Sequence, residues 1–240
     1  MTVTSFTFND LKSTDFNMYI NAEYEIASSA SDYQIVEVPG RDGDLIIPNN
    51  RYKSFVQELP IIYLGKHKET MQKIDQARQI MLADSKWHDF LFSFDRDYIY
   101  RAAYLSSFPV KKTVTGITQT LQFEMMPYKY LTSGQSYQTI TNKQVLTNPG
   151  TISAKPIIKV TGEGDCTIQI GSAKVSLKGI DTGIIMDTDS QSCTNLAGTR
   201  TAFDKMYGDF MSIAKGNQTV TITGDNITKI ELLPRWAVRS

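Results

Sequence analysis

Residues 38–45 read Val-Pro-Gly-Arg-Asp-Gly-Asp-Leu, a charged stretch with two glycines between two apolar segments. Glycine gives the backbone freedom that a sharp turn needs, and proline ends the strand that precedes it. The neighbouring segments TSFTFN, NMYINAEYEIA, DYQIVEV and RYKSFVQELPIIYLG alternate apolar and polar residues. Alternation with this period is typical of β-strands. The first 60 residues therefore predict an antiparallel sheet, with residues 38–45 as the tip of a hairpin.

A single helix is predicted at about residues 68–84. The segment KETMQKIDQARQIMLA contains neither Gly nor Pro, and it places Met71, Ile74 and Met81 near helical spacing. Its Lys, Gln and Arg residues can line a solvated face while the Met/Ile stripe packs on the sheet. Because strands precede and follow it, we expect an α+β first domain.

Strands resume after the helix. The segment ITQTLQFEMM, residues 117–126, places Ile117, Leu121, Phe123 and Met125 on one face of an amphipathic strand. After Tyr130 the composition shifts to Thr, Ser, Asn and Gly, as expected of a connector.

The second part of the chain contains short alternating strands that end in Gly or Asn, and no comparable helix. One predicted hairpin pairs the strand of Cys166, Ile168 and Ile170 with the strand of Val175 and Leu177. The fold class is therefore mainly β. We divide the chain into residues 1–135 and a β-sandwich of residues 136–240, and we expect the last residues to pack back on the first domain.

Composition excludes several classes of function. Lys plus Arg and Asp plus Glu both number 25, so the broad positive field that tight nucleic-acid binding requires is missing. The sequence starts with neither a basic leader nor a signal-length apolar run, and no later segment has the length of a membrane span, so we expect a cytoplasmic site of synthesis and no membrane partner. Cys166 and Cys193 are expected to be separate buried thiols.

No catalytic or metal-binding constellation is evident. His67 and His88 lie outside recognisable motifs, and we expect both to be surface or capping residues. The carboxylate pairs Asp95/Asp97 and Asp187/Asp189 do not continue into a calcium-loop pattern, which favours solvated turns. Residues 162–165, Gly-Glu-Gly-Asp, precede a strand where a phosphate loop would precede a helix, so we expect a turn there. The sequence therefore predicts no enzyme, no metal site and no cofactor.

A series of landmarks spans nearly the whole chain, and their order is more specific than any one of them. They resemble, taken together, the distal tail proteins (Dit) of long-tailed, non-contractile phages of Gram-positive bacteria. In the opening, Asp10 stands where that family has Gly. The landmarks are SFTFNDLKSTDFNMYI, VPGRDGDL, the single helix, YRAAYLSSF, FEMMPYKY, TNPGTISAKPIIKVTGEG and LLPRWAVRS.

The resemblance implies a structural protein of the phage or prophage tail. The first domain would build a homo-hexameric ring, alone or in two stacked rings, and a galectin-like β-sandwich would project from it. The expected location is the virion tail tip, after assembly in the bacterial host cytoplasm. The implied partners are the tail tube protein, the tape-measure protein, a tail-associated lysin or tail fibre hub, and the receptor-binding protein complex. DNA would pass through without tight binding.

The same resemblance assigns residues to two roles. Arg41, Asp42 and Gly43 would lie at an oligomer or tube interface, because an exposed tip with one cation and one anion is suited to pairing with a neighbour. The remaining landmark residues would be structural: Pro39, Gly40, Pro127, Tyr128, Pro156, Pro234, Arg235 and Trp236.

Three alternatives remain open. The sandwich could be a carbohydrate-binding module for host-surface glycans, although Trp236 is its only Trp and no His accompanies it. A wall-degrading enzyme would need a nucleophile and base, which the sequence does not present as a pair. A tail-tube protein would also be β-rich and ring-forming, but the second sandwich and the long helix argue against it.

Overall fold

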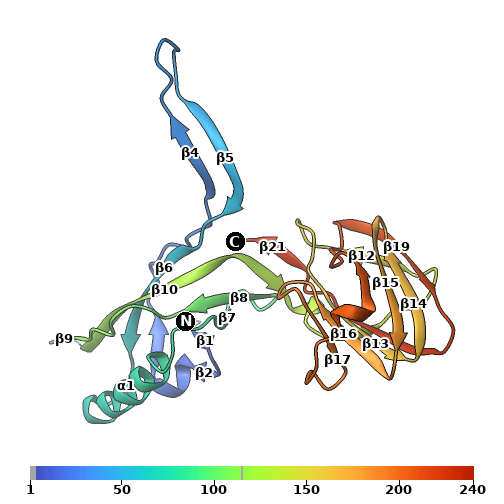
Figure 1. The fold of residues 1–240 in the computed structure, drawn as a ribbon. Coiled ribbons are helices and arrows are strands. Elements are labelled where there is room, and N and C mark those ends of the chain that lie inside the picture. Colours follow the sequence, from blue (N-terminus) through green and yellow to red (C-terminus); the bar gives the residue numbers. More distant parts are fainter. Residues whose placement is uncertain (1–3, 115) are drawn as a thin grey trace. The chain divides into compact units, whose positions relative to one another are not determined.

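The computed structural model describes residues 4–114 and 116–240, and it divides into two compact units (Figure 1). Unit 1 contains Met1–Lys129 together with Arg239–Ser240, and unit 2 contains Tyr130–Val238. The division falls a few residues before the one placed at 135/136 from the sequence. The chain is mainly β, with antiparallel sheets and one α-helix among the described residues, which confirms the predicted fold class.

Unit 1 is built on a nine-stranded antiparallel sheet. Its main path has the order β2-β1-β7-β8-β10-β6-β3, while β9 and β21 also pair with β10. Strands β4 and β5 form a separate two-stranded sheet. Strand β10 continues into unit 2, and β21 brings the chain back. The elements are β1 (Phe6–Phe8), β2 (Leu11–Lys12), η1 (Ser13–Phe16), β3 (Met18–Ile20), β4 (Ser31–Val36), β5 (Leu45–Tyr52), β6 (Phe55–Tyr63), α1 (His67–Met81), β7 (His88–Phe92), β8 (Tyr98–Ala103), β9 (Lys111–Thr113), β10 (Gly116–Leu131) and β21 (Ala237–Arg239).

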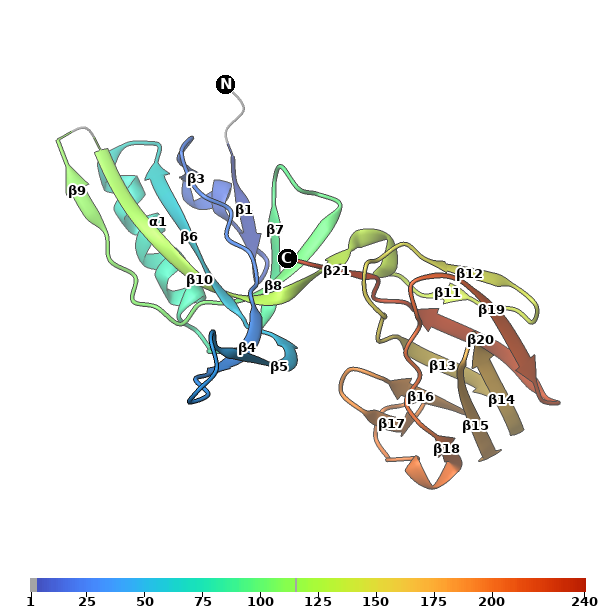
Figure 2. The same cartoon turned by 90° about the horizontal axis from the view of Figure 1, so that it is seen from above.

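Helix α1 lies against one face of this sheet (Figures 1 and 2). Its Ile74, Ala77 and Met81 side chains are buried in the same cluster as the inward residues of the sheet. The helix is three residues shorter at its C-terminal end than the predicted 68–84, because the backbone leaves helical geometry at Leu82. Apolar residues that recur every three or four positions thus form a continuous stripe along α1, and this stripe packs on the core as the sequence predicts.

Aromatic rings fill the centre of unit 1. Phe6 and Phe8 on β1, Phe90 on β7 and Phe123 on β10 have ring centroids 5.0–6.4 Å apart in the pairs that contact. Edge-to-face and offset arrangements at this distance contribute beyond the area that the rings bury. The register of β1, β7 and β10 is therefore tied to one aromatic cluster.

Unit 2 is a sandwich of two five-stranded sheets around its own core (Figure 2). One sheet has the order β11-β20-β13-β16-β17 and the other the order β12-β19-β14-β15-β18. The elements are η2 (Thr132–Gly134), β11 (Gln138–Thr139), β12 (Val145–Asn148), β13 (Ile157–Gly162), β14 (Gly164–Ile170), β15 (Ala173–Ile180), β16 (Gly183–Asp187), β17 (Ser192–Asn195), η3 (Phe203–Lys205), β18 (Met206–Gly208), β19 (Gly216–Thr223) and β20 (Ile227–Leu233).

The predicted hairpin of unit 2 is present as β14 and β15, which pair in antiparallel register from Cys166↔Leu177 to Ile170↔Ala173. Its inward residues are buried, as the alternation predicts. Cys166 and Cys193 are both free and buried in this core. Burial raises the pKa of each thiol to about 11, so both remain protonated near neutral pH.

Candidate assembly hairpin

Strands β4 and β5 form a hairpin that projects from the rest of unit 1 (Figure 1). The strands pair in antiparallel register, with Gln34 opposite Ile47, Ile35 opposite Ile46 and Val36 opposite Leu45. No other strand among the described residues pairs with either of them. An isolated two-stranded hairpin is marginally stable in water, so this one depends on its own tip and base.

The tip is a tight turn over Val38–Arg41. The amide of Arg41 donates to the carbonyl oxygen of Val38 at 3.1 Å, and Gly40 has φ +82°. Proline at the second position and a positive-φ glycine at the third are the requirements of a type II turn. Gly43 also has a positive φ, +76°, and open space around it. Pro39, Gly40 and Gly43 thus shape the tip.

Arg41 and Asp42 lie on this tip with exposed side chains. Neither side chain makes a hydrogen bond or ion pair with another described residue. Their charges therefore remain available to another molecule. The predicted interface residues Arg41, Asp42 and Gly43 therefore lie together at one exposed point.

The body of the hairpin exposes apolar side chains on both faces. Ile35 is 59% exposed and its cross-strand partner Ile46 is 64% exposed. Large apolar side chains gathered on an unpaired hairpin are typical of an interaction surface. The other exposed apolar residues of the hairpin are Tyr33, Val36, Val38, Leu45 and Ile47.

A buried carboxylate fixes the base of the hairpin. Asp32 lies at an irregularity in the β4 register, and its side chain is only 5% exposed. It accepts a hydrogen bond from Arg51 Nε at 2.6 Å and pairs with Lys53 Nζ at 3.0 Å. The hydrogen bonds from Arg51 and Lys53 lower the pKa of Asp32 to about 2. The bulge thus turns an acidic side chain inward, where Arg51 on β5 and Lys53 just after β5 hold it.

The returning end of the chain clamps the segment that leads into β4. Ser29 is buried, and its amide and hydroxyl both donate to the carbonyl oxygen of Ser240, at 3.2 and 3.0 Å. Arg239 donates from Nη2 to the Ser29 carbonyl at 2.5 Å and from Nε to the Ser29 hydroxyl at 3.2 Å. The amide of Ser240 donates to the Pro127 carbonyl at 2.9 Å. Residues far apart in the sequence therefore fix where the hairpin leaves the sheet.

Two aromatic rings extend this clamp to the other strand of the hairpin. Tyr52, the last residue of β5, meets Tyr128 edge to face, with ring centroids 6.0 Å apart. Arg239 lies over the Tyr52 ring. The landmark residues Pro127 and Tyr128 thus belong to the support of the hairpin, within unit 1.

The landmark residues of unit 2 have structural contacts. Pro156 is buried, and its carbonyl accepts from the Thr188 amide at 3.1 Å. Pro234 is also buried. Arg235 makes a bidentate ion pair with Asp187, at 2.6 and 3.1 Å, and Trp236 is 5% exposed in the core. A buried ring cannot stack on a sugar at the surface, so Trp236 offers no carbohydrate site.

The connector before β13 is held by one buried side chain. The Asn148 amide donates to the Ile152 and Ile213 carbonyls, and its oxygen accepts from the Gly150 amide at 2.9 Å. A Cβ on Gly150 would lie 2.3 Å from the Ala237 carbonyl oxygen. The TNPG landmark is therefore explained by close backbone packing inside unit 2.

The acidic pairs and His88 contact neighbouring side chains. Asp95 accepts from Tyr100 and Lys129, and Asp187 pairs with Arg235, so both are half-buried members of ion pairs where solvated turns were expected. His88 lies 2.7 Å from Asp84, and the side chain of His67 lies outside the described part. Within the described residues, no three potential ligands gather to hold a metal. In the same part of the chain, no helix is long and apolar enough to cross a membrane.

Sequence reasoning predicted the hairpin and its tip, but it did not predict that the strands project from the sheet with apolar side chains exposed. The alternation in DYQIVEV predicts a strand with one buried face, and nothing in that pattern indicates that its apolar side chains stay exposed. Asp32, Ser29 and Arg239 carry no local signal, because their partners lie on other segments. The one available signal was the combination of an apolar run with a charged, glycine-rich turn.

Comparison with solved structures shows which fold this is. The chain resembles the SPP1 Dit (gp 19.1) protein, described as a paradigm of the hub adsorption apparatus in phages that infect Gram-positive bacteria. That match has a TM-score of 0.73 at 15% identity and covers 96% of this chain and 97% of the other. A chain of the phage p2 baseplate in its activated conformation with Sr matches with a TM-score of 0.53 at 12% identity, covering 96% and 97%. No family model and no curated protein matches the sequence. The chain therefore has a Dit-like fold.

Proposed function

We propose that this protein is a structural, non-enzymatic component of a phage tail, a distal tail or baseplate hub. In this proposal six copies form a ring that joins the tail tube to the adsorption apparatus at the virion tail tip. The tape-measure protein and then DNA pass through the opening. The proposal rests chiefly on the projecting apolar hairpin, with support from the whole-chain likeness to a phage hub protein.

The hairpin supplies one of the surfaces that a ring requires. A closed cyclic ring uses heterologous contacts, in which one patch of a subunit meets a different patch of the next. Ile35 and Ile46 would be buried in that contact, and burial of apolar area is the dominant favourable term in association. Arg41 and Asp42 would set the register, because exposed ion pairs contribute only about 0–1 kcal/mol each.

Charge agrees with the role of a conduit. The formal net charge is zero, and a protein that lets DNA pass gains nothing from the phosphate affinity that a basic surface gives. The proposed protein partners are the tail tube protein, the tape-measure protein, a tail-associated lysin or fibre hub, and the receptor-binding protein complex.

The test is the mass of the purified full chain, measured by mass photometry over a range of concentrations and followed by negative-stain microscopy. We expect closed rings, and we expect Ile35→Ser combined with Ile46→Ser to convert them to monomers. Val145→Ser is the matched control, because Val145 is 60% exposed on β12 of unit 2. A chain that stays monomeric at high concentration, alone and with its tail partners, would refute the proposal.

A further inference from the structure

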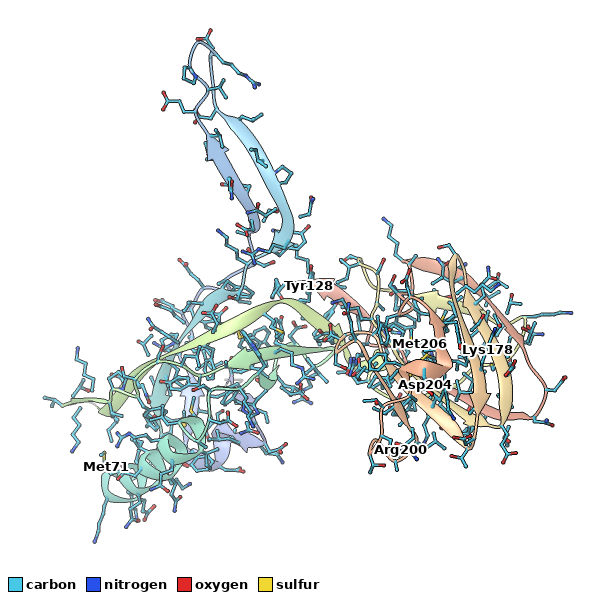
Figure 3. All side chains as sticks on the ribbon, viewed as in Figure 1. Met71, Tyr128, Lys178, Arg200, Asp204 and Met206 are labelled. Carbon is cyan, nitrogen blue, oxygen red and sulfur yellow. The ribbon has the colours of Figure 1, made fainter. Side chains whose placement is uncertain are left out.

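The tip of the β4–β5 hairpin contains an Asp-Gly peptide bond, between Asp42 and Gly43. It is the one place in the sequence where Gly follows an aspartate or an asparagine. Such a bond is chemically labile, because the amide nitrogen of Gly is unshielded and lies within reach of the side-chain carboxyl group of the residue before it. The side chains of this hairpin stand clear of the rest of unit 1 (Figure 3).

The two groups that react at such a bond are both free of other contacts here. The Asp42 side chain is exposed, and it makes no hydrogen bond or ion pair with another described residue. The Gly43 amide donates no hydrogen bond within the described part of the chain, since the turn is closed by the amide of Arg41 and the carbonyl of Val38. Neither group therefore has to give up a partner before the two meet.

The backbone around Asp42 is free to rotate. Gly43 has φ +76°, and no atom lies within 4 Å of the position that a Cβ would take. Gly40, on the other side of Arg41, also has a positive φ, +82°. Because glycine crosses between positive and negative φ at little cost, and because exposed loop tips are weakly restrained, the Gly43 nitrogen reaches the Asp42 carboxyl carbon by local rotation alone.

A second aspartate in the same tip lacks these features. Asp44 is also exposed, but the residue after it is Leu45. Leu45 is the first residue of β5 and lies opposite Val36 in the ladder, so its backbone is held in the strand. Its side chain also crowds its own amide nitrogen. The local structure therefore distinguishes Asp42 from Asp44, although both are exposed acidic residues of one loop.

We infer that Asp42 is a site of spontaneous isomerisation to isoaspartate. The Gly43 nitrogen attacks Cγ of Asp42 and forms an N–Cγ bond, while the carboxyl hydroxyl group leaves as water with the amide proton. The resulting succinimide takes up one water molecule. Opening at the former side-chain carbonyl restores aspartate, and opening at the former main-chain carbonyl leaves isoaspartate. The atoms of the protein are the same before and after, and no enzyme or cofactor takes part.

Isomerisation changes the shape of the tip. In isoaspartate the main chain runs through Cβ and Cγ of residue 42, so the loop between Val36 and Leu45 gains a backbone atom and the free carboxylate is attached one carbon closer to the chain. The spacing between this carboxylate and Arg41 changes with it. A free subunit therefore loses its ability to assemble as it ages, a consequence that rests on the proposed function, whereas the isomerisation itself does not.

The test is to incubate the full chain at physiological temperature and neutral pH and to sample it over time. A chymotryptic peptide of residues 34–45 contains both Asp42 and Asp44. Fragmentation by electron transfer locates isoaspartate in this peptide, and methyl transfer by an isoaspartyl methyltransferase measures its total amount. We expect isoaspartate to form at Asp42 at least about tenfold faster than at Asp44, which corresponds to a difference of about 1.4 kcal/mol in activation free energy.

Two variants test the chemistry of the step. Asp42→Glu keeps the charge but requires a larger ring that closes more slowly, so residue 42 should stay unchanged during the same incubation. Asp42→Asn reacts through the same succinimide with loss of ammonia, so this variant should lose its amide faster than the wild type isomerises. Thermal melting of the fresh proteins checks that both variants are folded.

Mass photometry then compares aged and fresh samples of each protein. Ring formation by the wild type should fall in proportion to its isoaspartate content, and aged Asp42→Glu protein should assemble like its own fresh sample. If fresh wild type forms no rings, the proposed function fails and the isoaspartate measurement still decides this inference. Absence of isoaspartate at residue 42, equal rates at Asp42 and Asp44, or an Asp42→Asn protein that keeps its amide would each overturn it.

Discussion

The Cζ atom of Arg239 lies 4.3 Å from the centroid of the Tyr52 ring. This contact joins the strand that returns to unit 1 with the end of β5, at the base of the hairpin. The same guanidinium donates to Ser29, which precedes β4. The Arg239 side chain therefore contacts residues at the base of both strands of the hairpin. Its removal should destabilise the hairpin more than the rest of the protein.

Arg239→Ala should loosen the hairpin. It removes two hydrogen bonds and a cation–π contact that is worth about 0.5–1 kcal/mol at an exposed site. We expect faster amide hydrogen exchange in residues 31–52 and unchanged exchange in unit 2. Arg101→Ala is the control, because Arg101 is an exposed arginine on β8 paired with Asp89. Equal exchange in the wild type and the Arg239→Ala protein would contradict the clamp.

Arg41→Ala should weaken assembly without unfolding the subunit. The side chain has no intramolecular partner among the described residues, so the free energy of unfolding should change by no more than about 0.5 kcal/mol, as for other surface substitutions. The measurement is ring formation, or tail-tube binding, by mass photometry at several salt concentrations. Arg96→Ala is the control, an exposed arginine outside the hairpin. An Arg41→Ala protein that is unfolded would contradict this prediction and would show that Arg41 is needed for folding of the subunit.

Asp32 should keep the hairpin base intact well below neutral pH. Its pKa falls from about 3.9 in the unfolded chain to about 2 in the folded protein, because Arg51 and Lys53 bind the charged form. A lowered folded pKa contributes stability that is present above the unfolded pKa and lost as pH falls through the folded one. The Arg51 Nε–H resonance should therefore shift with a midpoint near pH 2. A midpoint near pH 4 would show that the ion pair is not formed.

Asp32→Asn should disturb the hairpin at pH 7, because Arg51 and Lys53 lose the negatively charged carboxylate with which both are paired. Faster hydrogen exchange in residues 31–52 is the expected result, and the difference from wild type should vanish below pH 2. A difference that persists at that acidity would point to packing at Asp32 as its cause.

The two tryptophans allow the removal of a buried ring in unit 2 to be compared with the removal of an exposed ring in unit 1. Trp236 is 5% exposed and Trp87 is 39% exposed. Trp236→Ala should destabilise the protein by about 3–5 kcal/mol, the usual cost of removing a buried large aromatic. Trp87→Ala should cost far less. Calorimetric unfolding measures both, and similar melting temperatures for the two variants would contradict the burial of Trp236.

Local pattern predicted the elements that depend on local packing. Alternation located the inward face of β10, and helical spacing located Ile74 and Met81 on the core face of α1. The positive-φ glycines of the hairpin tip follow from the requirements of the turn. These features depend on residues that are close together in the sequence, so a single sequence is sufficient to predict them.

Features that join distant segments could not be predicted in this way. The apolar residues of β4 and β5 look like core residues in sequence, but Ile35 and Ile46 are 59% and 64% exposed among the described residues. Asp32 becomes buried through a register irregularity that pairs it with Arg51.

The return of the chain through β21 makes unit 2 an insertion within unit 1. The chain leaves unit 1 after Lys129 and re-enters at Arg239, and the hydrogen bond from Ser240 to Pro127 places exit and re-entry side by side. A short turn between these points could replace the whole sandwich without breaking the clamp on the hairpin. Unit 2 is therefore a structural insertion whose two ends meet within the scaffold of unit 1.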